Sequence, residues 1–341
     1  MFCFAFWNLE NLFAPENFPK REPRIASAIN SSLRGWSEAL FAQKIQQLSK
    51  VILAMNNARG PDVLGVCEVE NRFVLETLVE VLNAASGRVY DIVHADAEAD
   101  KRGIDTAFIF DSQVFSIVPN SIFSHIVIRR TGTRDITQVT FRSNSAGKDV
   151  VALANHWPSR SGSSVEETAG FRAVAGETLA YWHMRIREEL GDDIAIIAMG
   201  DFNDDPWNAS IQRNANAVRE QGDVERSRSA KFYNLAWQYL GKQCEDHRGE
   251  LRNIDGSLYY SGNGNVFDQL LVNRSLLKGE GGYVVDVPSA DIFTFSEMVD
   301  HRVGNGPRRF GLPDGNVEKN IDETGFSDHF PVSVMLDSVN N

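Results

Sequence analysis

The chain has 341 residues, of which 43% are hydrophobic and 23% charged, as in an ordinary soluble globular protein. The formal net charge of −12 argues against a protein that holds duplex DNA by broad electrostatic attraction, since such binding needs Lys and Arg to neutralise phosphates. It leaves room for an enzyme whose bound cations supply local positive charge.

The length exceeds the usual size of one domain, but a large α/β domain of this size is allowed. Because no linker rich in Pro, Gly or Ser separates two apolar patterns, we expect a single domain over residues 1–341.

No apolar run approaches the ~20 residues that a membrane span needs. The apolar start lacks a basic leader and a cleavage site, which favours a first strand over a signal peptide.

Three cysteines, Cys3, Cys67 and Cys244, form an odd set without metal-ligand spacing, which predicts reduced thiols rather than a disulfide framework. We therefore expect a cytoplasmic protein without membrane contact. No protein partner is inferable, and a monomer is the default expectation.

The first half of the chain is expected to alternate strands with helices. The apolar run Phe2–Trp7 predicts a strand, and residues 14–35 predict a surface loop. Ser37 is a plausible cap for a helix that runs to about Asn56. Asp105 is either an exposed residue of its strand or directed into a site. Further strands are expected at residues 63–68, 90–93, 101–110, 114–118, 122–128, 135–141 and 150–154, and a second helix at 73–82.

The second half begins with a long helical pattern from Ala173 to Leu190, followed by a buried strand at Ile194–Met199. Residues 208–231 predict a polar loop with a helical turn, and residues 232–240 predict a helix. Strands are expected at residues 269–272 and 330–336. The long loop expected between them, residues 286–325, is of a size that often carries function.

The strand at Ile194–Met199 ends in Gly200, Asp201, Phe202 and Asn203, and so delivers a carboxylate and a carboxamide where α/β folds keep their chemistry. Asp201 and Asn203 point the same way if the chain stays extended. The same composition is also ordinary for a turn.

Polar residues follow three more apolar runs: Asn8 and Glu10 follow the first, Glu68 the second, and Asn155 with His156 the third. Near the end of the chain the order reverses, because polar residues precede the last two strands. If those strands run antiparallel to the first four, all six polar ends meet at one edge. The residues that precede them are Asp268, and Asp328 with His329.

Five motifs occur in a fixed order along the chain: Trp7-Asn8-Leu9-Glu10-Asn11, Cys67-Glu68-Val69-Glu70, Asn155-His156-Trp157, Gly200-Asp201-Phe202-Asn203 and Ser327-Asp328-His329. Together they resemble the endonuclease/exonuclease/phosphatase superfamily, the fold of DNase I, over nearly the whole chain. The resemblance implies a four-layered α/β/β/α sandwich with mixed sheets. It also implies Mg²⁺-dependent hydrolysis of a phosphoester, with Mn²⁺ as a substitute. Residues 102–105 and 156–160 are similar to those of a bacterial subgroup classed as endonucleases.

The resemblance also implies a metal site. Glu68 would be the principal Mg²⁺ ligand, supported by Asn8, and Glu10 and Asp328 would contact the same ion or a second one. A lone acid at a strand end is otherwise usually a solvated cap.

Catalytic roles follow from the same resemblance. His329 would pair with Asp268, Asp201 would orient or deprotonate the attacking water, and Asn203 would hold a phosphate oxygen. His156 would donate to the scissile phosphate or assist the leaving group. Which group is the general base stays open.

Substrate contacts are expected from Asn8, Arg160 and Trp157. Arg160 would grip a phosphate, or else it is a surface arginine on a proline turn. Trp157 and Trp207 are taken as exposed aromatic residues that stack on bases. The remaining histidines match no motif and are expected to be structural or surface residues; they are His94, His125, His183, His247 and His301.

Three functional hypotheses remain. The first is a metal-dependent nuclease acting on DNA or RNA by in-line attack of water, which makes nucleic acid the expected partner. The second is a phosphodiesterase or phosphatase for a small molecule or a lipid headgroup. The third, a non-catalytic scaffold, is disfavoured because every motif residue is present. The choice between endo and exo action, and between one and two metals, stays open.

Overall fold

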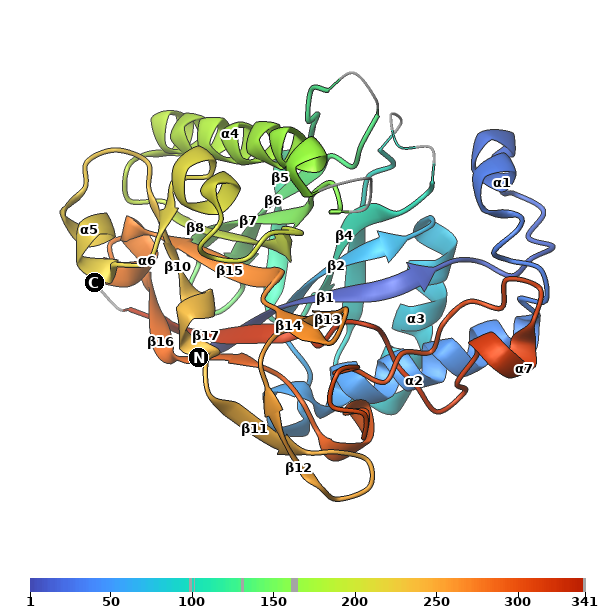
Figure 1. The fold of residues 1–341 in the computed structure, drawn as a ribbon. Coiled ribbons are helices and arrows are strands. Elements are labelled where there is room, and N and C mark those ends of the chain that lie inside the picture. The colour runs from blue at the N-terminus through green and yellow to red at the C-terminus, as the bar shows by residue number, and fades with distance from the viewer. Residues whose placement is uncertain (98–99, 101, 130–131, 161–164, 340–341) are drawn as a thin grey trace.

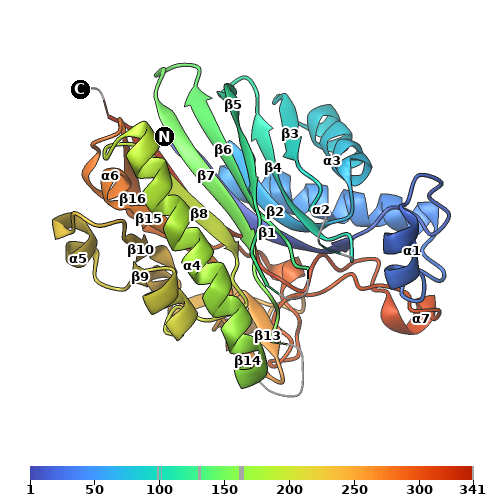
Figure 2. The same cartoon turned by 90° about the horizontal axis from the view of Figure 1, so that it is seen from above.

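The computed structural model describes residues 1–97, 100, 102–129, 132–160 and 165–339. Two mixed β-sheets face each other, and helices cover their outer faces (Figures 1 and 2). Helix α4 lies against one sheet, and helices α2 and α3 lie against the other. This is the α/β/β/α sandwich expected from the sequence.

The first sheet brings the beginning and the end of the chain together. Strand β1 pairs in parallel with β2 and antiparallel with β17. The carboxyl ends of β1 and β2 therefore lie beside the start of β17. In sheet order, its six strands are β16 (Tyr283–Ile292), β17 (Val332–Ser338), β1 (Phe2–Leu12), β2 (Val63–Val69), β4 (Asp105–Asp111) and β3 (Tyr90–His94).

The second sheet repeats this arrangement. Strands β7 and β8 are parallel, and β15 runs antiparallel to β8 with Asp268 directly opposite Asp201. All six polar strand ends thus lie at one edge, as the sequence predicted. In sheet order, the seven strands are β5 (Phe115–His125), β6 (Ile136–Ser143), β7 (Asp149–His156), β8 (Ala195–Asp201), β15 (Asp268–Asn273), β10 (Phe232–Asn234) and β9 (Ala217–Val218).

Two small hairpins lie outside the two large sheets, and three long helices cover the outer faces of those sheets. Ser37 caps α2 as expected, since its hydroxyl accepts a hydrogen bond from the Leu40 amide at 3.2 Å. The hairpins are β11 (Lys242–Glu245) with β12 (Leu251–Ile254), and β13 (Leu258–Tyr260) with β14 (Asn263–Asn265). The long helices are α2 (Glu38–Ala58), α3 (Arg72–Ala85) and α4 (Val165–Leu190).

Short helices occupy the connections between these elements. They are α1 (Pro23–Ile29), η1 (Ser210–Asn214), α5 (Gln221–Arg226), η2 (Leu235–Gln238), α6 (Arg274–Lys278), η3 (Ser296–Met298) and α7 (Val317–Asn320). Within the described part of the chain, no helix is long and apolar enough to cross a membrane. All three cysteines are free.

Aromatic rings fill the space between the two sheets. Phe4 of the first sheet contacts Phe115 of the second with ring centroids 5.7 Å apart, and Phe108 contacts Phe141 at 5.6 Å. Nearer the site the sheets approach more closely. A Cβ at Gly65 would lie 2.6 Å from the Met199 sulfur, so only glycine fits there. This close approach brings the polar ends of both sheets within reach of each other.

Four expectations for local structure are wrong. Residues 232–240 form strand β10 and the 3₁₀ turn η2. The backbone of residues 232–234 pairs with β15, and the Asn234 side chain caps the turn that follows. The expected loop at 286–325 begins inside strand β16, whose register shift between Asp286 and Asp291 breaks the alternation that would identify a strand. The strands expected at 114–118 and 122–128 are one strand, β5, with a similar irregularity. The loop at 14–35 contains helix α1.

Candidate active site

Asn8 lies where the edges of the two sheets meet. Its side-chain nitrogen donates to Glu68 Oε1 at 3.2 Å, at the end of β2 in its own sheet. The same nitrogen donates to Asp201 Oδ2 at 3.2 Å, at the end of β8 in the facing sheet. One carboxamide therefore links carboxylates from both sheets. It also lies 3.4 Å from His329 Nε2.

His329 and Asp268 form a buried ion pair. Their atoms Nδ1 and Oδ2 lie 2.7 Å apart, and the His329 carbonyl accepts a hydrogen bond from the Trp7 indole at 2.8 Å. Burial alone would lower the pKa of His329, but the charge and the hydrogen bond of Asp268, with help from Asp201, raise it well above its usual value. This environment favours the protonated form of His329.

His156 is the neutral counterpart of His329. Its Nε2 lies 3.7 Å from Glu68 Oε1 and 3.7 Å from Asp201 Oδ2. Burial lowers the pKa of His156 well below its usual value, and the nearby positive charge of Arg134 adds to the effect. The two imidazoles therefore lie in environments that favour opposite protonation states.

The backbone bends sharply where these side chains emerge. The pairing of β1 with β2 shifts register after Asn8, and that of β2 with β4 shifts after Cys67. Glu10 has a φ of 52°, Glu68 of 61° and Asn203 of 51°, all in the left-handed region that non-glycine residues rarely adopt. Such residues often lie at functional sites, and β-bulges redirect side chains there. At Glu68 the turn lets Oε2 accept a hydrogen bond from the Asn11 amide at 2.8 Å.

Carboxylates crowd this edge of the sandwich. Burial raises the pKa of Asp201 to about 6, and the nearby Asp268 contributes. Burial and the charge of Glu10 raise the pKa of Asp328 to about 7. The carboxylates of Glu68 and Asp328 remain 17% and 34% exposed. Hard oxygen donors that repel one another and reach solvent fit a Mg²⁺ ion, which takes one or two carboxylates and keeps several waters.

The sequence matches the model of the Endonuclease/Exonuclease/phosphatase family over residues 3–338. The chain belongs to this family. The activities that the family name gives all hydrolyse phosphoester bonds. No curated protein matches the sequence.

Solved structures of known proteins share the fold of this family member at low identity. The human Nocturnin catalytic domain with bound sulfate is 15% identical with a TM-score of 0.57, and the match covers 99% of this chain and 94% of that one. TDP2 from D. rerio in complex with a single-strand DNA product is 14% identical with a TM-score of 0.54, covering 99% of both chains. The mannosyl-6-phosphatase of Bacteroides thetaiotaomicron is 13% identical with a TM-score of 0.54, covering 99% and 100%. At this identity the likeness shows the fold alone.

Glu10 has a different environment from the one that its expected metal role requires. Its carboxylate is fully buried and accepts hydrogen bonds from Arg309 Nε at 2.7 Å and from the Phe310 and Gly311 amides, each at 3.1 Å. Lys44 Nζ lies 3.9 Å from the same carboxylate. Because three hydrogen-bond donors and the Lys44 ammonium surround these oxygens, we leave Glu10 out of the proposed ligand set.

Arg160 is held by hydrogen bonds and ion pairs to neighbouring protein groups. Nε contacts the Asn203 carbonyl and Asp204 Oδ1, each at 3.0 Å, and Nη2 contacts Asp205 Oδ2 at 2.9 Å. The guanidinium also lies over the Phe267 ring, 4.5 Å from its centroid. We therefore withdraw Arg160 as a phosphate ligand, because carboxylates already neutralise it.

The expectation that Trp157 is exposed is wrong. Its side chain is 1% exposed, packs edge-on against Phe202, and donates from Nε1 to Asn155 Oδ1 at 3.1 Å. A buried ring cannot stack on a base. Trp207 is 51% exposed, as expected.

Asn203 and Asp201 do not lie on one extended segment. Strand β8 ends at Asp201, and the positive φ of Asn203 turns the chain so that its amide donates to Asp201 Oδ1 at 2.9 Å. The Asn203 side chain donates to the Trp157 carbonyl at 3.1 Å. Asn203 thus positions the loops around Asp201. Gly200 is needed because a Cβ there would lie 2.5 Å from Asn155.

Asp105 is neither exposed nor directed at Glu68. It is buried, and its Oδ2 lies 3.1 Å from His94 Nε2. Two residues of the site region received no role from the sequence: Lys44 and Arg309. Lys44 carried a signal, because it interrupts the apolar face of α2. Arg309 lies in the expected loop at 286–325, and nothing local connects it with Glu10, 299 residues away.

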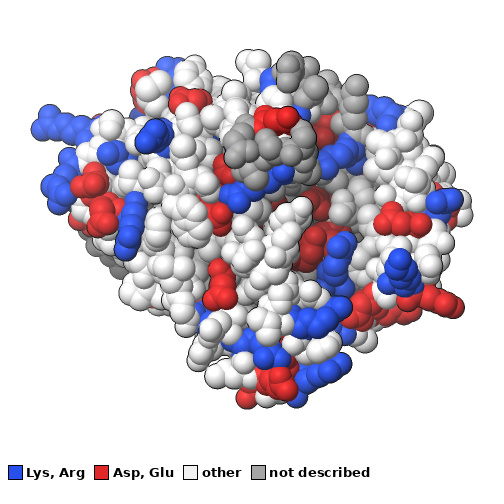
Figure 3. Space-filling model, viewed as in Figure 1, with Lys and Arg blue, Asp and Glu red and all other residues white. Residues whose placement is uncertain are grey.

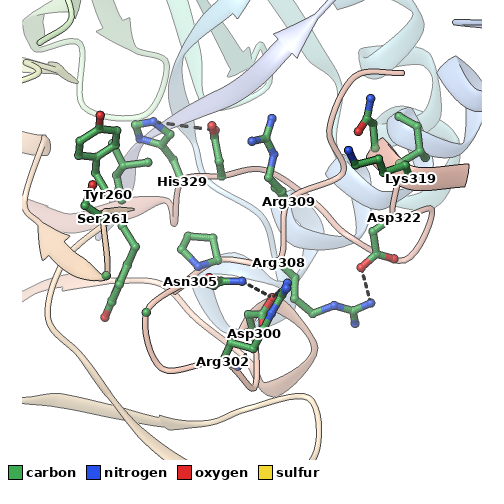
Figure 4. A pocket seen from close by; sticks show the side chains of 18 residues that line it. Tyr260, Ser261, Asp300, Arg302, Asn305, Arg308, Arg309, Lys319, Asp322 and His329 are labelled. Atoms are coloured by element: carbon green, nitrogen blue, oxygen red, sulfur yellow. Dashed lines mark hydrogen bonds and ion pairs between the residues drawn. The ribbon is translucent and has the colours of Figure 1, made fainter. Parts of the chain in front are cut away.

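A pocket of about 730 Å³ opens beside His329 and Asp328. The β13–β14 hairpin, residues 300–309 and the region of helix α7 complete its walls (Figure 4). On the face seen in Figure 3, Lys and Arg intermingle with Asp and Glu, and no continuous basic surface is visible there.

Proposed function

We propose that this protein is a Mg²⁺-dependent phosphodiesterase that acts on nucleic acid. The observation that carries the proposal is the meeting of Asn8, Glu68, Asp201 and His329 around one carboxamide, with Asp268 fixing the orientation of His329. Positioned charge of this kind is the main catalytic requirement for phosphoryl transfer.

Glu68 would hold the Mg²⁺ ion, with Asn8 and Asp328 as further oxygen donors. The ion would supply Lewis-acid polarisation of the phosphate and could be replaced by Mn²⁺. His329 would neutralise a phosphate oxygen, because its pairing with Asp268 keeps it protonated.

Asp201 would orient the attacking water and accept its proton, since its Oδ2 lies among Asn8, His156 and His329. His156, in its neutral form, would donate a hydrogen bond to the leaving group. Asn203 would act indirectly by holding the loop that follows Asp201.

An exposed aromatic ring supports nucleic acid as the substrate. Tyr260 lines the pocket next to His329 and is 74% exposed (Figure 4). Aromatic faces of this kind stack on bases without regard to sequence. The similarity of the fold to TDP2 solved with a single-strand DNA product adds support.

A phosphatase or phosphodiesterase for a small molecule is the second candidate. It is favoured by the net charge of −12 and by the mixed charges around the site, which offer little attraction for a long polyanion. The similarity of the fold to a mannosyl-6-phosphatase fits this alternative.

A matched activity panel separates the two candidates. Plasmid DNA, single-stranded DNA, RNA, bis-p-nitrophenyl phosphate and sugar phosphates are incubated with Mg²⁺, Mn²⁺ or EDTA, using the wild type and the His329→Ala variant. Metal-dependent cleavage of a polymer that the variant loses would establish a nuclease. Turnover of small esters alone would favour the second candidate, and no turnover of any substrate would contradict both.

A further inference from the structure

The pocket beside His329 is lined by four cationic side chains, of which two are neutralised by acids of the same pocket. Arg302 Nη2 lies 2.8 Å from Asp300 Oδ2, and Arg308 Nη2 lies 2.8 Å from Asp322 Oδ2. Both arginines therefore maintain the fold of the pocket wall. The other two cations, Arg309 and Lys319, have no ion pair with an acid lining the pocket among the described residues.

Arg309 is held from behind by Glu10. Its Nε donates to Glu10 Oε1 at 2.7 Å, while Phe310 and Gly311 anchor the other oxygen of this fully buried carboxylate. The positive charge of buried Lys44, 3.9 Å away, offsets the charge of Glu10. The Glu10 carboxylate therefore fixes Arg309, and the charge of Asp328, which lines the same pocket, also acts on this arginine.

The rest of the Arg309 guanidinium faces the pocket. The Arg309 side chain is 61% exposed, although its Nε donates to Glu10. Among the described residues, this is the one hydrogen bond that the guanidinium makes. A guanidinium held at Nε keeps its two terminal nitrogens free to bind two oxygens of one phosphate. Lys319 lies beyond Arg309 and reaches into the same side of the pocket (Figure 4).

His329 lies between Tyr260 and Arg309 in the pocket (Figure 4). A substrate whose scissile phosphate is at His329 would therefore have an aromatic surface on one side and two cations on the other. A single phosphate ester has nothing to place near the cations.

We propose that Arg309 and Lys319 bind a second phosphate of the substrate, one that flanks the scissile phosphate. Arg309 would make the paired hydrogen bonds, Lys319 would add charge, and Glu10 would be the positioning residue that aims Arg309. This inference rests on the proposed function, and it makes the enzyme selective for compounds that carry at least two phosphates.

Binding of dithymidine ligands tests this inference separately from catalysis. Dithymidine monophosphate without a terminal phosphate, its 5′-phosphorylated form and its 3′-phosphorylated form are titrated calorimetrically without added metal. We expect one phosphorylated form to bind the wild type at least about tenfold more tightly than the unphosphorylated form, since charge-assisted hydrogen bonds are of that strength.

Two variants assign this preference to a residue. Arg309→Gln should lose most of the preference, with the remainder due to Lys319, whereas Arg302→Gln removes the same charge from the same pocket and should keep the preference. Glu10→Gln should weaken the preference while Arg309 is still present, and a matching Tm would exclude unfolding. Equal binding of all ligands by the wild type would overturn the inference, as would equal losses in Arg309→Gln and Arg302→Gln.

Hydrolysis of the same three ligands with Mg²⁺ distinguishes the two proposals. Hydrolysis without any preference for a terminal phosphate would leave the proposed function in place and overturn this inference. Preferential binding without hydrolysis of any ligand would support the phosphate site and contradict the proposed function.

Discussion

Asp268 Oδ2 and His329 Nδ1 lie 2.7 Å apart and link the two sheets of the sandwich. Asp268 begins β15 of one sheet, opposite Asp201, whereas His329 lies three residues before β17 of the other. The pair therefore forms only when the two sheets pack in register. This links the packing of the core directly to the charge of the site.

Asp268→Asn should lower kcat by at least ~10²-fold. Asparagine keeps the shape of the side chain but removes the largest charge that raises the pKa of His329, so the protonated form of His329 becomes less favoured. Steady-state kinetics on the best substrate of the panel would measure this, with Asp291→Asn, a half-exposed acid of β16, as the control. A change in kcat of less than about threefold would contradict the assigned role.

Glu68→Gln should raise the Mg²⁺ concentration needed for activity and change the stability of the fold less. The amide keeps a side chain of the same size near Asn8 but removes the anionic oxygens that a Mg²⁺ ion prefers. We expect the Mg²⁺ concentration for half-maximal activity to rise at least about tenfold. Glu76→Gln, on the exposed face of α3, is the matched control. An unchanged Mg²⁺ dependence would remove Glu68 from the ligand set.

Arg160→Ala should affect stability and leave KM nearly unchanged. The side chain joins Asp204 and Asp205 and covers Phe267, so its loss removes one cationic partner from two largely buried carboxylates. Asp204 keeps Arg172 as a partner, and Asp205 keeps the Val266 amide. Because Arg160 is 23% exposed, we expect a loss of about 1–3 kcal/mol, below the value for a fully buried pair. Urea unfolding and KM are measured together. A raised KM at unchanged stability would instead support a phosphate contact.

His183→Phe should make the protein less sensitive to acid. His183 is buried, stacks on Phe232 with centroids 3.9 Å apart, and has a pKa that burial lowers to about 3. Below the unfolded-state pKa of roughly 6.5, the unfolded chain gains a proton that the folded protein does not, so stability falls as pH falls. At pH 5 this costs about 2 kcal/mol relative to pH 7.5, and the variant should avoid that loss.

Urea unfolding of wild type and His183→Phe at both pH values measures the difference. His301→Phe, at a partly exposed position, serves as the control. If both variants keep the wild-type pH dependence, His183 is not the group that titrates on unfolding.

The sequence predicts the strand ends of the site well, because an apolar run that stops at a polar residue is a local signal. Asn8, Glu68, Asp201 and His329 were placed at one edge by this reasoning together with the antiparallel direction of β15 and β17. Glu10 shows where such reasoning fails. Its spacing from Asn8 predicts the same side of a strand, but the positive φ at Glu10 turns its carboxylate toward Arg309.

The contacts of Arg160 and Trp157 depend on loops that pack against the segment after Asp201. Both residues stand next to a catalytic motif, which favours a functional interpretation. Their partners Asp204, Asp205 and Phe202 lie more than 40 residues away, so no local pattern predicts these contacts.

Metal-dependent hydrolysis by the wild type and His329→Ala tests the central claim most directly. The best substrate of the panel is assayed with Mg²⁺, after EDTA treatment, and after Mg²⁺ is restored, while Tm is recorded for both proteins. We predict that EDTA abolishes wild-type turnover and Mg²⁺ restores it. His329→Ala should lose at least ~10²-fold in kcat. Its Tm should fall, because Asp268 loses its buried partner, but a cooperative thermal transition above the assay temperature should show that the variant is folded. EDTA-resistant turnover, or a folded His329→Ala variant with wild-type kcat, would contradict the account.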